Sequence, residues 1–195
     1  RRLAGLTGPV EAESRRLRER EEELLGAYRA IVGARLGGAR IRVHGDYHLG
    51  QVLYTGNDFI IIDFEGEPAR PLSERRLKRS PLSDVAGMLR SFEYAAHTAL
   101  FGSAERGAIR DEDVPVLLPW ARSLSQWVSS AFLRAYLPSI QAAGLVPTDR
   151  DQLGTLLRVL LLDKAVYEIG YELNNRPDWA RIPIRGILDL LRGGS

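Results

Sequence analysis

The residues best suited to chemistry in this 195-residue chain fall between positions 44 and 68. The string His-Gly-Asp-Tyr-His-Leu-Gly-Gln occupies 44–51, and Asp-Phe-Glu-Gly-Glu-Pro occupies 63–68. Between them, a Gly-Asn-Asp turn at 56–58 joins two β-rich pieces. A hairpin brings its two ends within a few ångströms of each other, so Gln51 and Asp63 are expected to be neighbours.

These residue types suit phosphoryl transfer. Asp46 would orient and deprotonate an attacking hydroxyl group, and the side-chain oxygens of Gln51 and Asp63 would hold Mg²⁺ against the phosphates of a nucleotide. Protein kinases use an aspartate, an asparagine five residues later, and a second aspartate that begins the next loop. The spacing from Asp46 to Gln51 is the same, with glutamine in place of asparagine.

The pattern His-Gly-Asp-x-His, followed by a hairpin and Asp-Phe-Glu, resembles the signature of aminoglycoside and related small-molecule phosphotransferases. The Gln51 variant, the 63–68 string and Tyr-Glu-Leu-Asn-Asn-Arg-Pro-Asp-Trp at 171–179 together look like the maltokinase family. The likeness extends from about position 44 to the C-terminus. It implies transfer of the γ-phosphoryl group of ATP to the anomeric hydroxyl group of maltose, giving maltose 1-phosphate, with a role in α-glucan or trehalose-linked metabolism.

The resemblance assigns roles to individual residues. Asp46 matches the catalytic base, Gln51 and Asp63 match the Mg²⁺ ligands, and Asp84 matches an aspartate that caps the following helix and tethers the catalytic loop. Further candidates for contacts with the cofactors or with the loop itself are His44 (which would brace the loop), His48 and Glu65. The maltose pocket is expected to be lined by Tyr171, Glu172, Asn174, Asn175, Arg176 and Trp179.

A kinase of this type also needs an N-terminal lobe, with a strand lysine that pairs with the phosphates of ATP. Of the 27 basic residues only Lys78 and Lys164 are lysines, and both follow the catalytic loop. We therefore interpret the sequence as a C-terminal lobe without the nucleotide-binding lobe, and expect it alone to bind ATP poorly and to turn over negligibly. Its expected partners are maltose and either the missing lobe or a fused trehalose synthase domain, as in some maltokinases.

Other functions remain open at this point. Another small-molecule kinase, acting on an aminoglycoside, a choline-like amine or a different sugar, would use the same catalytic residues. An amine would favour an acidic pocket, whereas the Asn, Arg and Trp residues near the C-terminus favour a neutral polyol. A non-catalytic module that binds a sugar or a partner is a further alternative, which divalent-metal binding would distinguish. A transition-metal site at His44 and His48 lacks a third ligand, because His97 falls on an ordinary helix.

The elements that position these residues are mostly helical. Apolar periodicity predicts a helix that ends at Gly37-Gly38, a strand at 40–44 and an irregular stretch up to Pro81. Ser83 or Asp84 is expected to N-cap the next helix. Trp120 and Trp127, seven residues apart on one helix face, are expected in the core. The predicted helices span residues 11–36, 85–100, 114–136, 150–173 and 183–191, and the predicted strands of the hairpin span 51–55 and 59–63.

The predicted fold class is α+β, mostly α-helical: the C-terminal lobe of a protein-kinase-like fold with a small β-hairpin at the catalytic loop. Residues 1–39 would form a leading helix and linker, 40–68 the catalytic loop, hairpin and metal loop, and 83–195 a helical substrate-binding subdomain. The absence of cysteine excludes disulfides and thiolate metal sites. The net charge of +2 and the intermingled charges do not indicate a nucleic-acid partner. No apolar run approaches the ~20 residues that span a bilayer, so no membrane partner is expected. The expected location is the cytoplasm.

Overall fold

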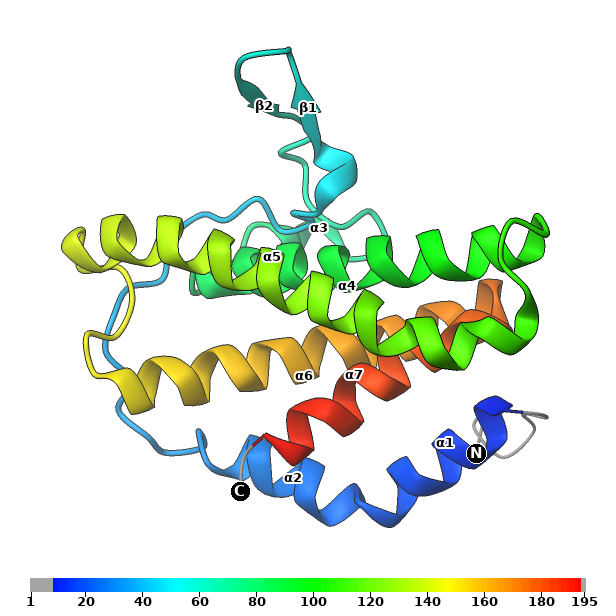
Figure 1. The fold of residues 1–195 in the computed structure, drawn as a ribbon. Coiled ribbons are helices and arrows are strands. Elements are labelled where there is room, and N and C mark those ends of the chain that lie inside the picture. The colour runs from blue at the N-terminus through cyan, green and yellow to red at the C-terminus, as the bar shows by residue number, and fades with distance from the viewer. Residues whose placement is uncertain (1–8, 194–195) are drawn as a thin grey trace. The chain divides into compact units, whose positions relative to one another are not determined.

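The computed structural model describes residues 9–193 and divides the chain into two compact units (Figure 1). Unit 1 comprises the chain up to Gly37 and the chain from Asp149 onward, and unit 2 comprises Gly38–Thr148. The fold is mostly helical with one small antiparallel sheet, which confirms the predicted fold class. Within the described residues, no helix is both long enough and apolar enough to cross a membrane.

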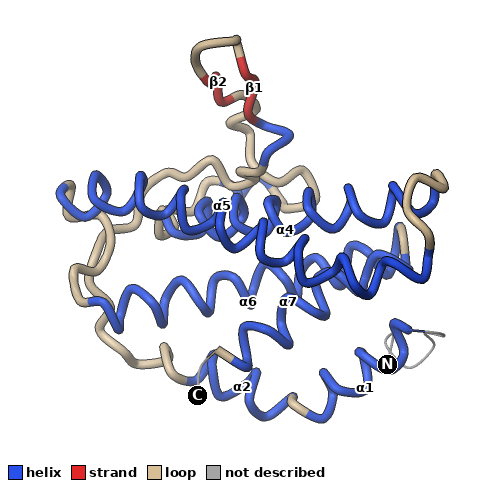
Figure 2. Tube along the Cα trace, viewed as in Figure 1, coloured by secondary structure: helices blue, strands red, loops and turns tan. Residues whose placement is uncertain are grey.

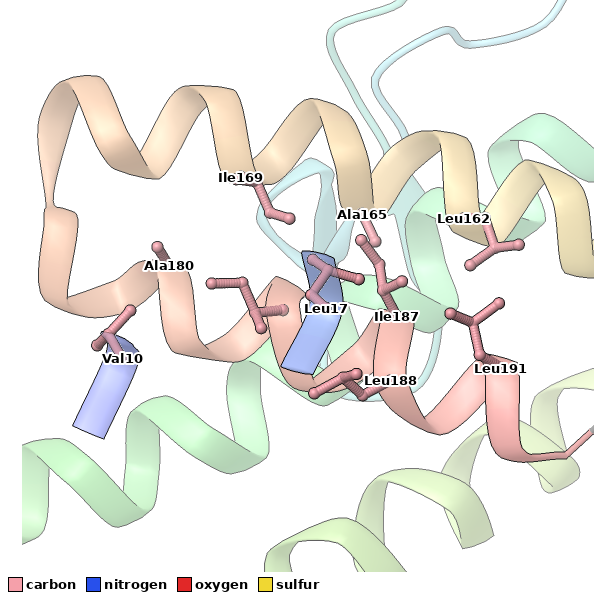
Figure 3. Close-up of a cluster of buried hydrophobic side chains, with 10 residues drawn as sticks. Val10, Leu17, Leu162, Ala165, Ile169, Ala180, Ile187, Leu188 and Leu191 are labelled. Carbon is pink, nitrogen blue, oxygen red and sulfur yellow. The ribbon is translucent and has the colours of Figure 1, made fainter. Parts of the chain in front are cut away.

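Unit 1 is a small helical bundle whose core lies between its longest helix and its last one. The apolar positions of the longest helix recur at helical spacing, and they pack against a matching face of the last helix and against the first helix (Figure 3). Its elements are α1 (Pro9–Glu19), α2 (Glu21–Arg29), α6 (Arg150–Asn175), the 3₁₀ turn η4 (Pro177–Ala180) and α7 (Arg181–Arg192). The labelled core residues include Leu17, Leu162, Ala165, Ile169, Ile187, Leu188 and Leu191.

The leading helix predicted over 11–36 is instead two helices, and it ends earlier than expected. The backbone leaves helical geometry at Arg20, whose guanidinium group bonds the Glu23 carboxylate and the Leu188 carbonyl oxygen at 3.3 Å. Helix α2 then ends at Arg29, and Gly33 adopts a φ of 81° that continues no helix. Val32, an apolar residue of the predicted helix, is largely exposed because the helix that would have turned it inward has already ended.

Unit 2 pairs two long helices beneath the loops that carry the candidate catalytic residues (Figure 1). Phe92 of one long helix meets Phe132 of the other edge to face, with 5.8 Å between ring centroids. The elements are the 3₁₀ turn η2 (Leu49–Gln51), β1 (Val52–Tyr54), β2 (Phe59–Ile61), α3 (Leu72–Arg75), α4 (Leu82–Glu105), the 3₁₀ turn η3 (Asp111–Asp113) and α5 (Val114–Ala142). The four later helices predicted from periodicity are thus present, and each is longer than predicted.

Three local predictions in unit 2 are wrong. The strand expected at 40–44 is a single bridge, because only Ile41 and Arg79 exchange backbone hydrogen bonds there, at 2.9 Å each. The expected N-cap is also absent: α4 begins at Leu82 after Pro81, without a side-chain cap. Trp120 and Trp127 are exposed rather than buried, because α5 turns a different face toward α4.

Candidate catalytic loop and metal site

The catalytic loop, residues 44–51, is fastened to the start of helix α4 by one carboxylate. The backbone N–H groups of His44 and Gly45 donate to the two oxygens of Asp84, at 2.7 and 2.9 Å. The tether expected of Asp84 is therefore present in the structure. Asp84 does not cap its own helix because both of its oxygens accept from the loop.

His44 joins the catalytic loop to the end of the hairpin. Its Nδ1 atom accepts the N–H of Asp46 at 3.3 Å, so the ring proton belongs on Nε2, which donates to the Ile62 carbonyl oxygen at 2.7 Å. The buried ring also packs on Phe64, with 4.9 Å between centroids. One ring nitrogen is therefore bonded within the loop and the other to the end of the hairpin, which supports the bracing role predicted for His44.

Asp46, the candidate base, faces a second histidine. Its Oδ2 atom lies 3.6 Å from Nε2 of His48, whose Nδ1 atom accepts the N–H of Gly50 at 3.0 Å. That second bond N-caps the 3₁₀ turn η2 and fixes the orientation of the His48 ring. Asp46 is thus a half-buried carboxylate on a braced loop, and the neighbouring His48 ring is held in place by a backbone N–H group. Such a group can accept a proton from a hydroxyl group that approaches it.

The hairpin brings Gln51 and Asp63 together, as the turn sequence predicts. Strands β1 and β2, drawn red in Figure 2, pair with Val52 opposite Ile61, and the Gln51 Nε2 atom donates to Asp63 Oδ2 at 2.9 Å. Asp63 has a φ of 63°, and among the described non-glycine residues it alone has a positive φ. A carboxylate held in this sparsely populated conformation at the end of a strand is typical of a functional position.

The donor set of this pair fits Mg²⁺. An amide oxygen and a carboxylate are hard oxygen ligands, and Mg²⁺ usually takes only one or two carboxylates from a protein, with water and phosphate completing its octahedron. The described residues contain no group of three or more His, Asp or Glu side chains able to hold a metal ion. His97 is buried in α4, and its Nδ1 atom lies 2.8 Å from the Glu93 carbonyl oxygen, so it does not complete a histidine metal site.

Glu65, the remaining candidate in the metal loop, is exposed. Its backbone carbonyl oxygen accepts from the Arg75 guanidinium group at 3.4 Å, and the stem of Arg75 lies over Gly66. Helix α3, in the stretch predicted to be irregular, therefore helps to hold the metal loop by placing Arg75 beside it.

Sequence reasoning missed two residues of α4 that also hold the catalytic loop. A Cβ atom on Gly87 would sit 2.6 Å from the Tyr47 carbonyl oxygen, so only glycine allows the loop this close to the helix. The Ser91 hydroxyl oxygen accepts the N–H of Leu49 at 3.2 Å. Asp84, Gly87 and Ser91 follow one another at helical spacing of three and four residues. This row of small and polar residues at helical spacing was the available signal.

We expect Gly87→Ala to damage activity more than stability. The added methyl group meets backbone, which cannot rotate away, so the catalytic loop must shift outward from α4. A misplacement of about 1 Å can cost on the order of 100-fold in rate. Steady-state kinetics of the full-length protein would show this loss of kcat, whereas Gly154→Ala, at a helical glycine with open space around it, should leave kcat unchanged.

The residues predicted to bind the sugar belong to unit 1, at the end of α6 and in η4. Glu172 is 2% exposed and accepts two hydrogen bonds from Arg176, at 3.0 and 2.8 Å. The Arg176 guanidinium group in turn stacks 4.4 Å from the centre of the Trp179 ring. Tyr171 is exposed. The structure therefore brings these residues together at one helix end, and their role in sugar binding remains a prediction.

The two asparagines of this segment fold back on the helix that carries them. The Asn174 side-chain N–H donates to the Gly170 carbonyl oxygen at 2.8 Å, and that of Asn175 donates to the Tyr171 carbonyl oxygen at 2.7 Å. Each side-chain amide thus donates a hydrogen bond to the helix backbone, and this bond sets the orientation of the amide oxygen.

Comparison with known proteins relates this whole arrangement to sugar kinases. No family model matches the chain. It is 28% identical over 180 residues to a glucosamine kinase of Streptacidiphilus jiangxiensis and 31% identical over 185 residues to one of Mycolicibacterium smegmatis (strain ATCC 700084 / mc(2)155), in each case over 92% of this chain. Solved glucosamine kinase structures superpose with TM-scores of 0.75 and, for a complex with glucosamine, ADP and inorganic phosphate, 0.74. The fold is kinase-like.

The extent of these matches limits what they show. The solved structures match 98% and 97% of this chain at 28% and 27% identity. The chain spans only 38% and 41% of the two curated relatives, and 42% and 41% of the two solved chains. The relatives are sugar kinases, which fits the alternative of another small-molecule kinase, and they do not support the maltokinase family in particular.

Proposed function

We propose that this chain is the C-terminal lobe of an ATP-dependent kinase that phosphorylates a hydroxyl group of an amino sugar of the glucosamine type. The observation that carries the proposal is the catalytic loop itself. Asp46 stands on a loop tethered by Asp84, and Gln51 and Asp63 form a hydrogen-bonded pair whose oxygens suit a metal ion. The likeness to glucosamine kinases over 92% of the chain supplies the class of acceptor.

In this proposal Asp46 accepts the proton of the acceptor hydroxyl group. The acceptor oxygen then bonds to the γ-phosphorus of ATP while the bond from that phosphorus to the bridging oxygen breaks, and ADP leaves with the electron pair. His48, fixed by the N–H of Gly50, places its Nε2 atom 3.6 Å from the Asp46 carboxylate. Gln51 and Asp63 would hold Mg²⁺, which when bound neutralises charge on the phosphates.

The charge balance of the 171–179 segment supports an amine-bearing acceptor. The positive charge of Arg176, which on sequence grounds favoured a neutral polyol, is compensated by Glu172 in a bidentate pair. A protonated amine offers only donors, and Asn175 carries an Oδ1 acceptor on a side chain that its own N–H anchors to the helix. Asp178 adds an exposed carboxylate to the same segment.

We further propose that a lobe outside this sequence covers the nucleotide. The hairpin above the catalytic loop exposes several large apolar side chains, which is unusual for a solvated surface and typical of a surface that another part of a protein covers. These exposed residues are Leu53, Tyr54, Phe59, Ile60 and Phe64. Neither lysine of the chain precedes the catalytic loop, so the lysine that pairs with phosphate must come from that lobe.

The proposal is tested by a panel of acceptors given to the full-length protein with ATP and Mg²⁺. We expect glucosamine to be phosphorylated, and phosphorus NMR would identify the hydroxyl group that carries the new phosphate. Maltose, an aminoglycoside and choline serve as competing acceptors. A product from maltose alone would restore the maltokinase reading, and the absence of any product would favour a non-catalytic module. Binding of Mn²⁺ to the 195-residue chain, weakened by Asp63→Asn, would argue against the non-catalytic module, because a decayed lobe has no reason to keep a metal site.

A further inference from the structure

Helix α5 carries a row of exposed apolar side chains that the proposed activity does not use. Val116, Trp120, Leu124 and Trp127 are 67%, 73%, 56% and 71% exposed. Their spacing of four, four and three residues places them on one face of the helix, and Ala131, also exposed, continues the row by four more. We call these five residues the tryptophan row. Large apolar patches of this kind mark interaction sites, and tryptophan is the residue most enriched where binding energy concentrates.

The order of residues in the tryptophan row suits a second copy of itself. When two α5 helices lie antiparallel about a two-fold axis between Ser123 and Leu124, Trp120 of one copy is level with Trp127 of the other. In the same register Val116 is level with Ala131, so a larger side chain meets a smaller one at each end. A two-fold interface requires such a self-complementary surface, because the same patch is used twice.

Charges flanking the tryptophan row favour the same antiparallel register. Asp113, in the turn before α5, would be level with Arg134 of the second copy, and Arg134 is exposed. A parallel pair would instead bring two copies of Arg134 together, which disfavours that arrangement. Asp113 already pairs with Arg110 at 2.8 Å, so this end of the helix presents an ordered ion pair to the partner.

The tryptophan row can supply the centre of an interface of ordinary size. A tryptophan buries about 150–250 Å² when covered, and a standard interface covers roughly 800 Å² on each partner. The two tryptophans with Val116 and Leu124 supply the centre of such an interface. Helix α5 has 29 residues and is therefore about 43 Å long, so polar side chains beside the row can supply the rim.

We propose that this protein forms a homodimer in which α5 of one copy packs antiparallel against α5 of a second copy through the tryptophan row. The interface lies within unit 2 and does not depend on the proposed kinase activity. A second copy satisfies both the palindromic order of the row and its flanking charges, which a partner of unrelated sequence would match only by coincidence.

Sedimentation equilibrium of the 195-residue chain tests the dimer. We expect a mass of twice 21.7 kDa, and dissociation into single chains on dilution. The double variant Trp120→Ala/Trp127→Ala should raise the dissociation constant on the order of 100-fold or more. Gln126→Ala, an exposed position on the same helix outside the row, should leave it unchanged. Because both tryptophans are exposed, the double variant should keep the circular dichroism spectrum of the parent.

Single cysteines report the register, since the natural chain has none. In the antiparallel pair two cysteines introduced by Ser123→Cys lie beside the two-fold axis, whereas two introduced by Val116→Cys lie about 22 Å apart along the helices. A short thiol-specific cross-linker should therefore join copies of the first variant and not of the second. Efficient cross-linking through position 116, a dimer unaffected by loss of both tryptophans, or a single-chain mass at every concentration would each overturn the proposal.

Discussion

Replacing Asp46 with asparagine is expected to lower the rate of phosphoryl transfer by the full-length protein by about 10²–10⁴-fold. Asparagine keeps the size and shape of the side chain but cannot accept a proton from the acceptor hydroxyl group. The contacts described above that hold the loop come from Asp84, His44 and Ser91, so the variant should fold normally. The loss should appear in kcat, with little change in the KM for the sugar.

The matched control is Asp58→Asn, which removes the same charge from the turn of the hairpin. Asp58 is exposed, and its carboxylate accepts the local N–H of Phe59 at 2.7 Å. Steady-state assays of both variants with ATP, Mg²⁺ and glucosamine would compare the two positions. Equal activity of the Asp46 and Asp58 variants would remove Asp46 from the role of base.

Replacing Asp84 with alanine is expected to lower both stability and activity. The N–H groups of His44 and Gly45 would each lose a charged acceptor, and a hydrogen bond to a charged group contributes about 1.5–3 kcal/mol. Because Asp84 is only half-buried and water can replace part of this loss, we expect the free energy of unfolding to fall by about 2–4 kcal/mol. The released loop should also reduce kcat in the full-length protein.

Urea unfolding followed by circular dichroism measures the first effect. Asp149→Ala is a suitable comparison, since Asp149 N-caps α6 through one bond to the N–H of Gln152 at 2.8 Å and its loss should cost only about 1 kcal/mol. A second signal comes from Tyr47. Burial raises the pKa of its hydroxyl group and the negative charge of Asp84 raises that pKa further, so the alanine variant should titrate Tyr47 at lower pH. A variant of Asp84 no less stable than that of Asp149 would contradict the tether.

The hairpin and the Gln51–Asp63 pair could be predicted from sequence because both depend on local rules. A turn of Gly, Asn and Asp between two β-rich pieces fixes which residues meet, and the structure confirms the meeting with a hydrogen bond. The strands are shorter than predicted, since the ladder ends where Asp63 turns to a positive φ. The tether was expected from resemblance alone, because no local pattern connects Asp84 with residues 40 positions earlier.

The failures have a common physical cause: each required knowledge of what covers a surface. Periodicity placed Trp120 and Trp127 on one helix face correctly, but it does not say whether that face meets protein or solvent. Asp84 had a good sequence position for capping, and the loop amides took its oxygens instead.

The chain enters unit 2 at Gly38, beside the residues through which it leaves that unit, and this has a consequence for how the molecule is built. The N–H of Ala39 donates to the Leu145 carbonyl oxygen at 3.1 Å, and a Cβ atom on Gly38 would lie 2.9 Å from the Cα atom of Val146. Unit 2 therefore begins and ends at the same place, as a segment inserted into unit 1 at one point of the chain would. Such an insertion can be exchanged or lengthened in evolution without changing the path of the chain in unit 1. The catalytic loop belongs to unit 2 and the 171–179 segment to unit 1, so the sequences of the two can diversify separately.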